Sequence, residues 1–246
     1  MSIETQADLD GLRAAGRVVA RAIRAMCARV RPGVSTAELD LVGGRVFAAA
    51  GARSGPQLAY NFPGVNCISV NDEAVHGIPG RRKLREGDLV KLDVTAELDG
   101  YYADACVSVP VGTVPPSRLS LIAAGQAALT QAIAVAHAGT PINEIGRTVQ
   151  QVVSARGYSV CPELTGHGIG RRIHEWPTVP NYDTPELSQP LTAGLVITIE
   201  PIISAGTGAV YQSPDGWTIK TADKTVSAHV EHTIIITDQA PLLVTA

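Results

Sequence analysis

The chain has 246 residues, of which 45% are hydrophobic and 17% charged, so it contains enough apolar material for a packed core. This composition excludes an intrinsically disordered chain. The formal net charge is -3, without the basic excess of a general nucleic-acid-binding protein, and we expect no nucleic-acid partner.

The N-terminal residues 1–11 are polar and acidic and lack the basic segment and apolar run of a secretory signal. No uninterrupted apolar stretch is long enough to span a membrane, because Gln126, Gln131 and His137 break the longest one. We therefore expect a cytoplasmic protein without a membrane partner. The four cysteines form no C-x-x-C pair, which predicts reduced packing residues rather than a disulfide framework or a structural zinc site.

Two helices are predicted next. Apolar residues recur at steps of three and four over 12–30, which indicates a helix with one buried face that the Pro-Gly pair at 32–33 ends. Ser35 followed by Glu38 has capping-box spacing and predicts a second helix, for which Gly51 is the expected stop. Strands should follow.

A β-hairpin is the clearest local prediction. Residues 89–98 alternate in polarity, Asp99-Gly100 supplies a two-residue turn, and residues 101–109 form the returning strand. A turn of this length fixes the register, so that Leu98 lies opposite Tyr101.

Two carboxylates of this hairpin are predicted to converge. Thr95 lies opposite Asp104 in this register, and Asp93, two residues from Thr95, projects from the same face as Asp104. An arbitrary pair of strand acids is more often structural. Two like charges this close are nevertheless unfavourable unless a proton or a cation lies between them, so the pair indicates a metal site.

The second half of the chain repeats the arrangement of the first. Two proline-led helices are predicted at 115–139 and 140–157, again before strands. Glycines recur at a constant offset, Gly33 with Gly139 and Gly51 with Gly157, which favours a duplicated unit with a site between its halves. Glycine after a helix is common, so chance matches are the alternative.

Further metal-binding side chains occur in the second half. Three glycines surround His167, Glu200 ends an apolar strand at 195–199, and Glu231 begins the last apolar strand, which includes 234–236. Carboxylates at the ends of apolar strands are costly unless they are paired or metal-bound. One histidine with several carboxylates suits Mn, Fe, Co or Zn, and two such metals could share bridging carboxylates.

Seven short motifs combine these residues with tight turns: Val75-His76-Gly77-Ile78-Pro79, Leu92-Asp93-Val94-Thr95, Asp99-Gly100-Tyr101-Tyr102-Ala103-Asp104, Gly166-His167-Gly168-Ile169-Gly170, Ile199-Glu200-Pro201, Asp215-Gly216-Trp217-Thr218 and Glu231-His232-Thr233. Together they resemble the motifs of the type I methionine aminopeptidases along nearly the whole chain. The resemblance implies the α+β pita-bread fold, in which two pseudo-symmetric halves form a curved, mostly antiparallel sheet covered by helices. We expect one catalytic domain, 1–246, with halves at roughly 7–112 and 115–240.

The resemblance also implies a cofactor and a reaction. Two divalent metal ions (Co, Mn, Fe or Zn) would be held by five ligands: Asp93, Asp104, His167, Glu200 and Glu231. Asp104 and Glu231 would bridge the two ions. The implied reaction removes the initiator methionine from polypeptides with a small second residue, by means of a hydroxide that the metals activate.

Histidines and a glutamate are expected to take part directly. Glu200 would relay a proton to the leaving amine, and His174 would hydrogen-bond the carbonyl oxygen as its charge develops. The resemblance implies that His76 contacts the scissile amide nitrogen. His229 lies on the predicted strand face of a metal ligand and would support it, whereas His232 points to the other face and is expected to be structural.

The resemblance also implies a pocket for the first side chain of the substrate, formed by Phe62, Cys67 and Trp217 with Tyr60 and Ile173 nearby. An apolar, aromatic pocket suits methionine. The chain departs from the usual family sequence at 58–63 and 163–165, which leaves an altered preference for the N-terminal residue as an alternative.

Two other functions stay open. A proline-directed peptidase of the same fold is disfavoured, because such relatives typically carry a large additional N-terminal domain. A non-catalytic peptide-binding paralogue would usually have lost metal ligands, and none of the five is replaced here. The expected partners are N-termini of nascent polypeptides, at the ribosome, and the expected state is a monomer.

Overall fold

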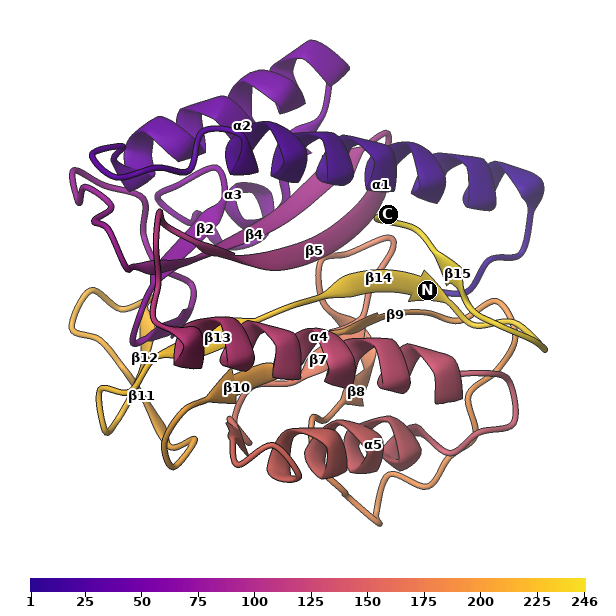
Figure 1. The fold of residues 1–246 in the computed structure, drawn as a ribbon. Coiled ribbons are helices and arrows are strands. Elements are labelled where there is room, and N and C mark those ends of the chain that lie inside the picture. The colour runs from indigo at the N-terminus through magenta and orange to yellow at the C-terminus, as the bar shows by residue number, and fades with distance from the viewer.

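The computed structural model describes residues 1–246. The first half contains α1 (Gln6–Cys27), α2 (Thr36–Ala50), β1 (Arg53–Ser54), α3 (Gly55–Tyr60), β2 (Cys67–Val70), β3 (Glu73–Val75), β4 (Leu89–Leu98) and β5 (Tyr101–Pro110). The second contains α4 (Pro116–Val135), α5 (Ile142–Ser154), β6 (Ser159–Val160), β7 (Gly166–Gly168), β8 (Glu175–Val179), β9 (Val196–Ile199), β10 (Ile202–Ser204), β11 (Val210–Gln212), β12 (Ile219–Thr221), β13 (Ser227–His229), β14 (His232–Ile235) and β15 (Leu242–Leu243). Figure 1 shows α1 and α2 on one side of the strands and α4 and α5 on the other.

The first two helices occur where they were predicted, with different ends for α1. This helix begins at Gln6, because Thr5 and Asp8 form a capping box within the polar N-terminal stretch, and it ends at Cys27, short of the predicted residue 30. The start and end of α2 are as predicted, since Ser35 caps its N-terminus and Gly51 adopts φ 69° at its C-terminus.

The predicted hairpin is confirmed. Leu98 pairs with Tyr101 and Thr95 with Asp104 in the antiparallel ladder between β4 and β5. Asp99 and Gly100 have φ values of 51° and 84°, as a two-residue hairpin turn with two left-handed residues requires.

The two helices of the second half differ from α1 and α2 in how their N-termini are capped. Pro115 and Pro141 occupy the N-cap positions of α4 and α5, and neither helix has a side-chain cap. Both helices lie within their predicted ranges. The turn glycines of the two halves have the same conformation, with φ 87° at both Gly33 and Gly139.

The last predicted apolar strand is interrupted, contrary to the sequence pattern. β13 ends at His229 and pairs with β10, whereas β14 begins at His232 and pairs with β9. Between them, the backbone of Glu231 exchanges hydrogen bonds with that of Cys106 in β5, at 2.9 and 3.4 Å. The chain leaves one sheet for another at this point, and this crossing brings Glu231 to the hairpin. β15 follows β14, which is therefore not the final strand.

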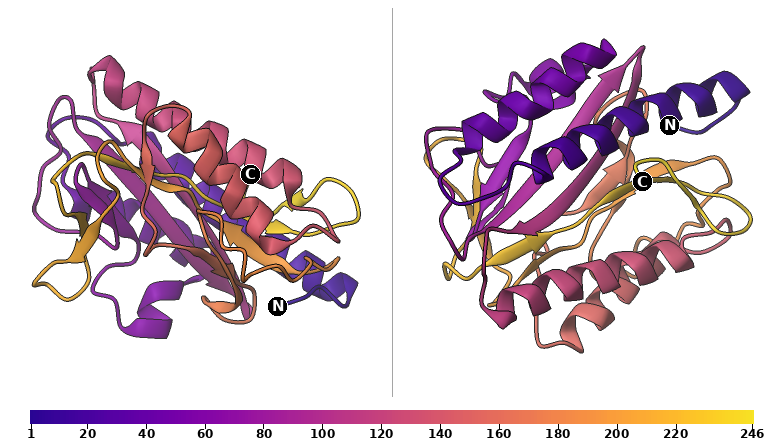
Figure 2. Two further views of the ribbon diagram at one scale, coloured as in Figure 1. Left: turned by 90° about the horizontal axis from the view of Figure 1, so that it is seen from below. Right: turned by 45° about the horizontal axis from the view of Figure 1, so that its top comes forward.

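Two hydrophobic clusters support the two halves. One joins α1 and α2 to β4 and β5, and the other joins α4 and α5 to β9 and β14. Figure 2 shows each helix pair lying across its own group of strands. One helix, α4, is long and apolar enough to cross a membrane, but its side chains Leu121, Ile122 and Leu129 are buried in the second cluster, as in a core helix.

Candidate metal centre and substrate pockets

The five predicted metal ligands line one pocket of about 250 Å³. Asp93 and Asp104 come from the β4–β5 hairpin, and His167 from β7. Glu200 directly follows β9, and Glu231 lies between β13 and β14. Residues from both halves of the chain therefore meet at one point.

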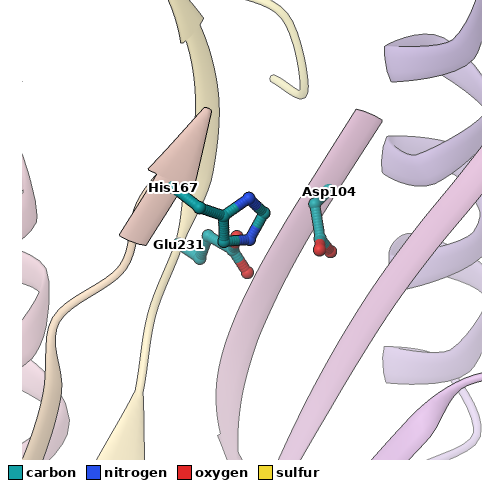
Figure 3. A group of neighbouring side chains, drawn as sticks. All are labelled: Asp104, His167 and Glu231. Carbon is teal, nitrogen blue, oxygen red and sulfur yellow. The ribbon is translucent and has the colours of Figure 1, made fainter. Parts of the chain in front are cut away.

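The ligand atoms are close together. Atoms of Asp104, His167 and Glu231 lie within 4.8 Å of one another, and Figure 3 shows these three side chains converging from separate segments of the chain. Nε2 of His167 is 3.5 Å from Oε2 of Glu200. Nδ1 of His167 bonds the carbonyl of Gly168 at 2.9 Å, which leaves Nε2 free to face the carboxylates.

The electrostatics of this cluster are unfavourable without a cation. Burial raises the pKa of Asp104 to about 6 and that of Glu200 to about 8. Burial and the neighbouring carboxylates raise the pKa values of Asp93 and Glu231 well above their ordinary values. Burial lowers the pKa of His167 to about 3, so its imidazole is a neutral ligand.

Two buried oxygens of the cluster indicate the kind of ligand that its residues fit. Oδ1 of Asp104 and Oε1 of Glu231 have no hydrogen-bond partner, which is costly in a protein interior. Both belong to a group of four carboxylates and one neutral imidazole, the donor set that divalent transition metals accept. The residues present therefore fit divalent metal binding.

Two threonines hold three of the predicted ligands, namely Glu200, His167 and Asp104. Oγ1 of Thr198 donates to Oε2 of Glu200 at 2.7 Å and accepts from the backbone N–H of His167 at 3.1 Å. Oγ1 of Thr233 donates to the carbonyl of Asp104 at 2.7 Å and accepts from its N–H at 2.9 Å. Thr233 thereby ties β14 to the hairpin.

Sequence reasoning did not identify these threonines as functional residues. Each lies two residues from a carboxylate ligand along the chain, as Thr198 does from Glu200 and Thr233 from Glu231. In a strand this spacing places two side chains on the same face, so the period of two was the available signal.

A buried lysine was also missed. Nζ of Lys91, in β4, donates to the carbonyls of Asn71 and Ser227 at 2.7 and 3.2 Å and to Oγ of Ser227 at 3.1 Å. Burial lowers the pKa of Lys91 to about 7. These hydrogen bonds join the first half of the chain to Ser227 in β13, which lies four residues before the predicted metal ligand Glu231.

The predicted catalytic histidines border the cluster. His76 and His174 both line the pocket that contains the ligands, and His76 adopts φ 57°, an uncommon conformation for a residue other than glycine. The ring of His174 lies 4.1 Å from that of His167, and its Nδ1 is hydrogen-bonded to the hydroxyl of Tyr60. Surrounding protein atoms lower the pKa values of both His76 and His174.

A second, smaller pocket of about 80 Å³ adjoins the cluster and is lined by Tyr60, Phe62, Cys67, Ile173 and Trp217, together with Pro56, Thr95, His76, His174 and the two aspartates of the hairpin. It contains all five residues predicted for the substrate side chain. Phe62 and Trp217 pack edge to face with their ring centroids 5.2 Å apart, although they are far apart in the sequence.

His229 and His232 have the different surroundings predicted for them, although they lie in two strands, β13 and β14, and not on opposite faces of one. Nε2 of His229 lies 3.6 Å from Oε2 of Glu231, and neither ring nitrogen of this buried side chain has a hydrogen-bond partner. Nδ1 of His232 instead bonds Oγ1 of Thr245 at 2.9 Å, away from the ligands.

Comparison with known proteins places this geometry in a family. The model of metallopeptidase family M24 matches residues 10–238. Methionine aminopeptidase 2 of Bacillus subtilis (strain 168) is 42% identical over 100% of this chain and 99% of its own length. The crystal structure of methionine aminopeptidase from Rickettsia prowazekii is similar with a TM-score of 0.96, 36% identity and 100% coverage of both chains.

A more distant structure shares the fold alone. Prolidase from Pyrococcus furiosus, at 22% identity, is similar with a TM-score of 0.80 over 99% of this chain and 65% of its own. These neighbours confirm the predicted pita-bread architecture. On the match to the family model and the full-length relatives, the chain belongs to metallopeptidase family M24.

Proposed function

We propose that this protein removes the N-terminal methionine from polypeptides with a small second residue, as a metal-dependent aminopeptidase. The observation that carries the proposal is the junction of two pockets. The carboxylate cluster borders both the larger pocket and the smaller apolar one, so a bond held at the cluster has an apolar site for the preceding side chain.

Asp93, Asp104, His167, Glu200 and Glu231 would hold two divalent ions, with Asp104 and Glu231 shared between them. Such ions, when bound, supply a water activated at neutral pH and polarise the carbonyl of the scissile bond. The unpartnered oxygens of Asp104 and Glu231 support the shared role of these two residues.

Glu200 is the proposed proton carrier. It lines the pocket beside the other four predicted ligands, where its carboxylate would take a proton from the attacking water and return it to the leaving amine. Thr198 fixes one of its oxygens, which orients the other toward the pocket.

His174 would hydrogen-bond the carbonyl oxygen while negative charge develops there. The hydrogen bond from Tyr60 to Nδ1 supports this role, because it fixes the ring and leaves Nε2 for the substrate. His76 borders both pockets and would contact the scissile amide nitrogen.

Specificity would come from the smaller pocket. Phe62, Trp217, Ile173 and Cys67 offer an apolar lining for a flexible thioether side chain, and Tyr60 closes the pocket beside His174. We propose nascent polypeptide N-termini at the ribosome as the substrates, the cytoplasm as the location and a monomer as the active state.

A peptide panel tests the proposal. Met-Ala-Ser, Met-Pro-Ser and Ala-Pro-Ser would be incubated with protein loaded separately with Mn, Fe, Co or Zn, and the released amino acid measured. We expect release of methionine from Met-Ala-Ser with at least one metal. Preferential cleavage of Ala-Pro-Ser would favour a proline-directed peptidase instead, and peptide binding without cleavage under every metal would favour a non-catalytic binding protein.

A further inference from the structure

The basic residues of this chain are distributed unevenly. Residues 11–37 contain six arginines and no acidic residue, while the other 14 basic residues share the rest of the chain with all 23 acidic ones. The net charge of -3 therefore conceals a strongly basic region within an acidic molecule. The expectation of no nucleic-acid partner rested on the total alone.

Four of these arginines form a stripe along α1. Arg13, Arg17, Arg21 and Arg24 follow one another at spacings of four, four and three, which places them on one face of the helix. All four are exposed, and none forms an ion pair or a hydrogen bond within the chain. At 1.5 Å per residue the stripe is about 16 Å long. We call these four residues the arginine stripe.

Basic residues continue beyond the end of α1. Arg29 and Arg31 line a surface depression of about 240 Å³ together with Arg45 of α2. Glu38 is the acidic residue there, and its carboxylate is engaged by the N–H and hydroxyl of Ser35 at 2.8 and 2.7 Å. These hydrogen bonds do not neutralise Glu38, but three arginines outnumber this one carboxylate, so the surface here keeps a net positive charge.

We propose that the arginine stripe binds the phosphate backbone of an RNA duplex. Guanidinium groups remain charged at all physiological pH values and match phosphate oxygens with two parallel hydrogen bonds. A duplex presents about one negative charge per 1.7 Å of its axis, so several phosphates lie within the length of the stripe. The choice of RNA over DNA rests on the proposed function, whose substrates are made at the ribosome.

The surroundings of the stripe favour a nucleic acid over a lipid surface. A helix that lies in a membrane interface needs apolar side chains to insert beside its basic face. The large apolar side chains of α1, such as Leu12, Val19 and Ile23, are instead buried against β4 and β5. The outer face of α1 therefore offers charge without an apolar anchor.

RNA bound there would leave the catalytic pocket open. The core packed under α1 includes Leu92 and Val94 of β4, whereas Asp93 projects from the opposite face of that strand. Figure 2 shows α1 on the outside of the hairpin. Binding at the arginine stripe and hydrolysis of a short peptide should therefore be independent.

The test is fluorescence anisotropy with a labelled 16-base-pair RNA duplex at several salt concentrations. Arg17→Gln/Arg21→Gln removes two charges from the stripe, and Arg156→Gln/Lys224→Gln is a control that removes two exposed charges from the second half. We expect wild type and control to bind with Kd of about 10⁻⁶ to 10⁻⁴ M at physiological salt and more tightly at low salt. The stripe variant should bind more weakly, with a slope of log K against log salt reduced by about 2.

Other outcomes overturn the proposal. These are no binding of the RNA duplex by wild type at low salt, equal binding by the stripe variant, tighter binding of the matching DNA duplex, or equally tight binding of phosphatidylserine vesicles. Hydrolysis of Met-Ala-Ser is measured on the same samples, and it should not change in the stripe variant. If wild type does not hydrolyse the peptide but the stripe variant alone binds RNA more weakly, the proposed function is contradicted and the proposed RNA-binding surface is supported.

Discussion

The two halves of the molecule position their proposed metal ligands in different ways. The first half presents Asp93 and Asp104 from a single hairpin, whose two-residue turn sets their alignment. The second half presents His167, Glu200 and Glu231 from three separate segments, which tertiary packing alone brings together. The hairpin thus aligns two of these residues locally, with Thr233 of β14 also bonding the Asp104 backbone, whereas the other three depend on the sheet, on Thr198 and on the crossing between β13 and β14.

The largest expected effect comes from removing one carboxylate with a proposed bridging role from each half. Asp104→Asn and Glu231→Gln should each lower kcat/KM for Met-Ala-Ser by at least about 10³-fold, because metal binding supplies several kcal/mol of transition-state stabilisation. Steady-state kinetics with saturating Mn²⁺ measures this, with circular dichroism to verify folding. Activity within tenfold of wild type in a folded variant would show that the replaced carboxylate is not a metal ligand needed for the reaction.

The pH dependence of stability should separate the carboxylates from the histidines. The folded metal-free protein holds protons on its carboxylates, with the pKa of Glu200 raised to about 8, so this contribution to stability is lost as pH rises toward 8. His167, with its pKa lowered to about 3, loses stability only as pH falls below its ordinary value near 6.5. Between pH 6.5 and 8 the carboxylates lower stability as pH rises, whereas Lys91, with its pKa lowered to about 7, opposes part of this fall above pH 7.

The free energy of unfolding of the metal-free protein should accordingly fall between pH 6.5 and 8. The fall is up to about 2 kcal/mol for each carboxyl group that stays protonated in the folded state. Urea unfolding at pH 6.5, 7.25 and 8 measures it. Glu231→Gln should show a smaller fall, because one of the mutually repelling carboxylates is gone. A free energy of unfolding that rises over this window would contradict the assignment.

Substitution of the threonines tests whether their hydrogen bonds hold the proposed ligands in position. Thr198→Val should weaken Mn²⁺ binding by about 10- to 100-fold, since the hydrogen bonds that orient Glu200 and the His167 backbone are lost. Thr233→Val should do the same through Asp104 and β14. Thr130→Val, on the exposed face of α4, is the control and should bind Mn²⁺ as wild type does. Equal affinity in all three variants would mean that strand pairing alone positions the ligands.

The hairpin turn gives the smallest expected effect. Gly100→Ala places a side chain at φ 84° and should lower the free energy of unfolding by about 1 to 2 kcal/mol. Gly80→Ala is the matched control, because the nearest atom to an added Cβ there is 4.0 Å away and its φ is not positive. An unchanged urea midpoint in Gly100→Ala would indicate that the turn does not determine the register.

This contrast also explains what could be predicted from the sequence. The pairing of Thr95 with Asp104 followed from the length of one turn, and α2 followed from Ser35, Glu38 and Gly51, because these signals act over a few residues. The extra turns at the start of α1 were missed because the apolar pattern begins at Leu12, after the capping box.

Long-range features were less accessible. The break at Glu231 arises because its backbone pairs with Cys106, a contact that no local pattern encodes. The roles of Thr198 and Lys91 depend on partners far away in the sequence, so only the finished packing assigns them. The motifs that carry the family resemblance supplied the ligand set without that packing.

The central claim is that both halves together hold two metal ions that drive hydrolysis. The most direct measurement adds Mn²⁺ in steps to chelator-treated, dialysed protein and follows both bound metal, by calorimetry, and methionine release from Met-Ala-Ser. The account predicts two Mn²⁺ per chain at saturation and activity that appears only as metal binds. Full activity in the metal-free protein, or saturation with Mn²⁺ without any methionine release, would contradict it.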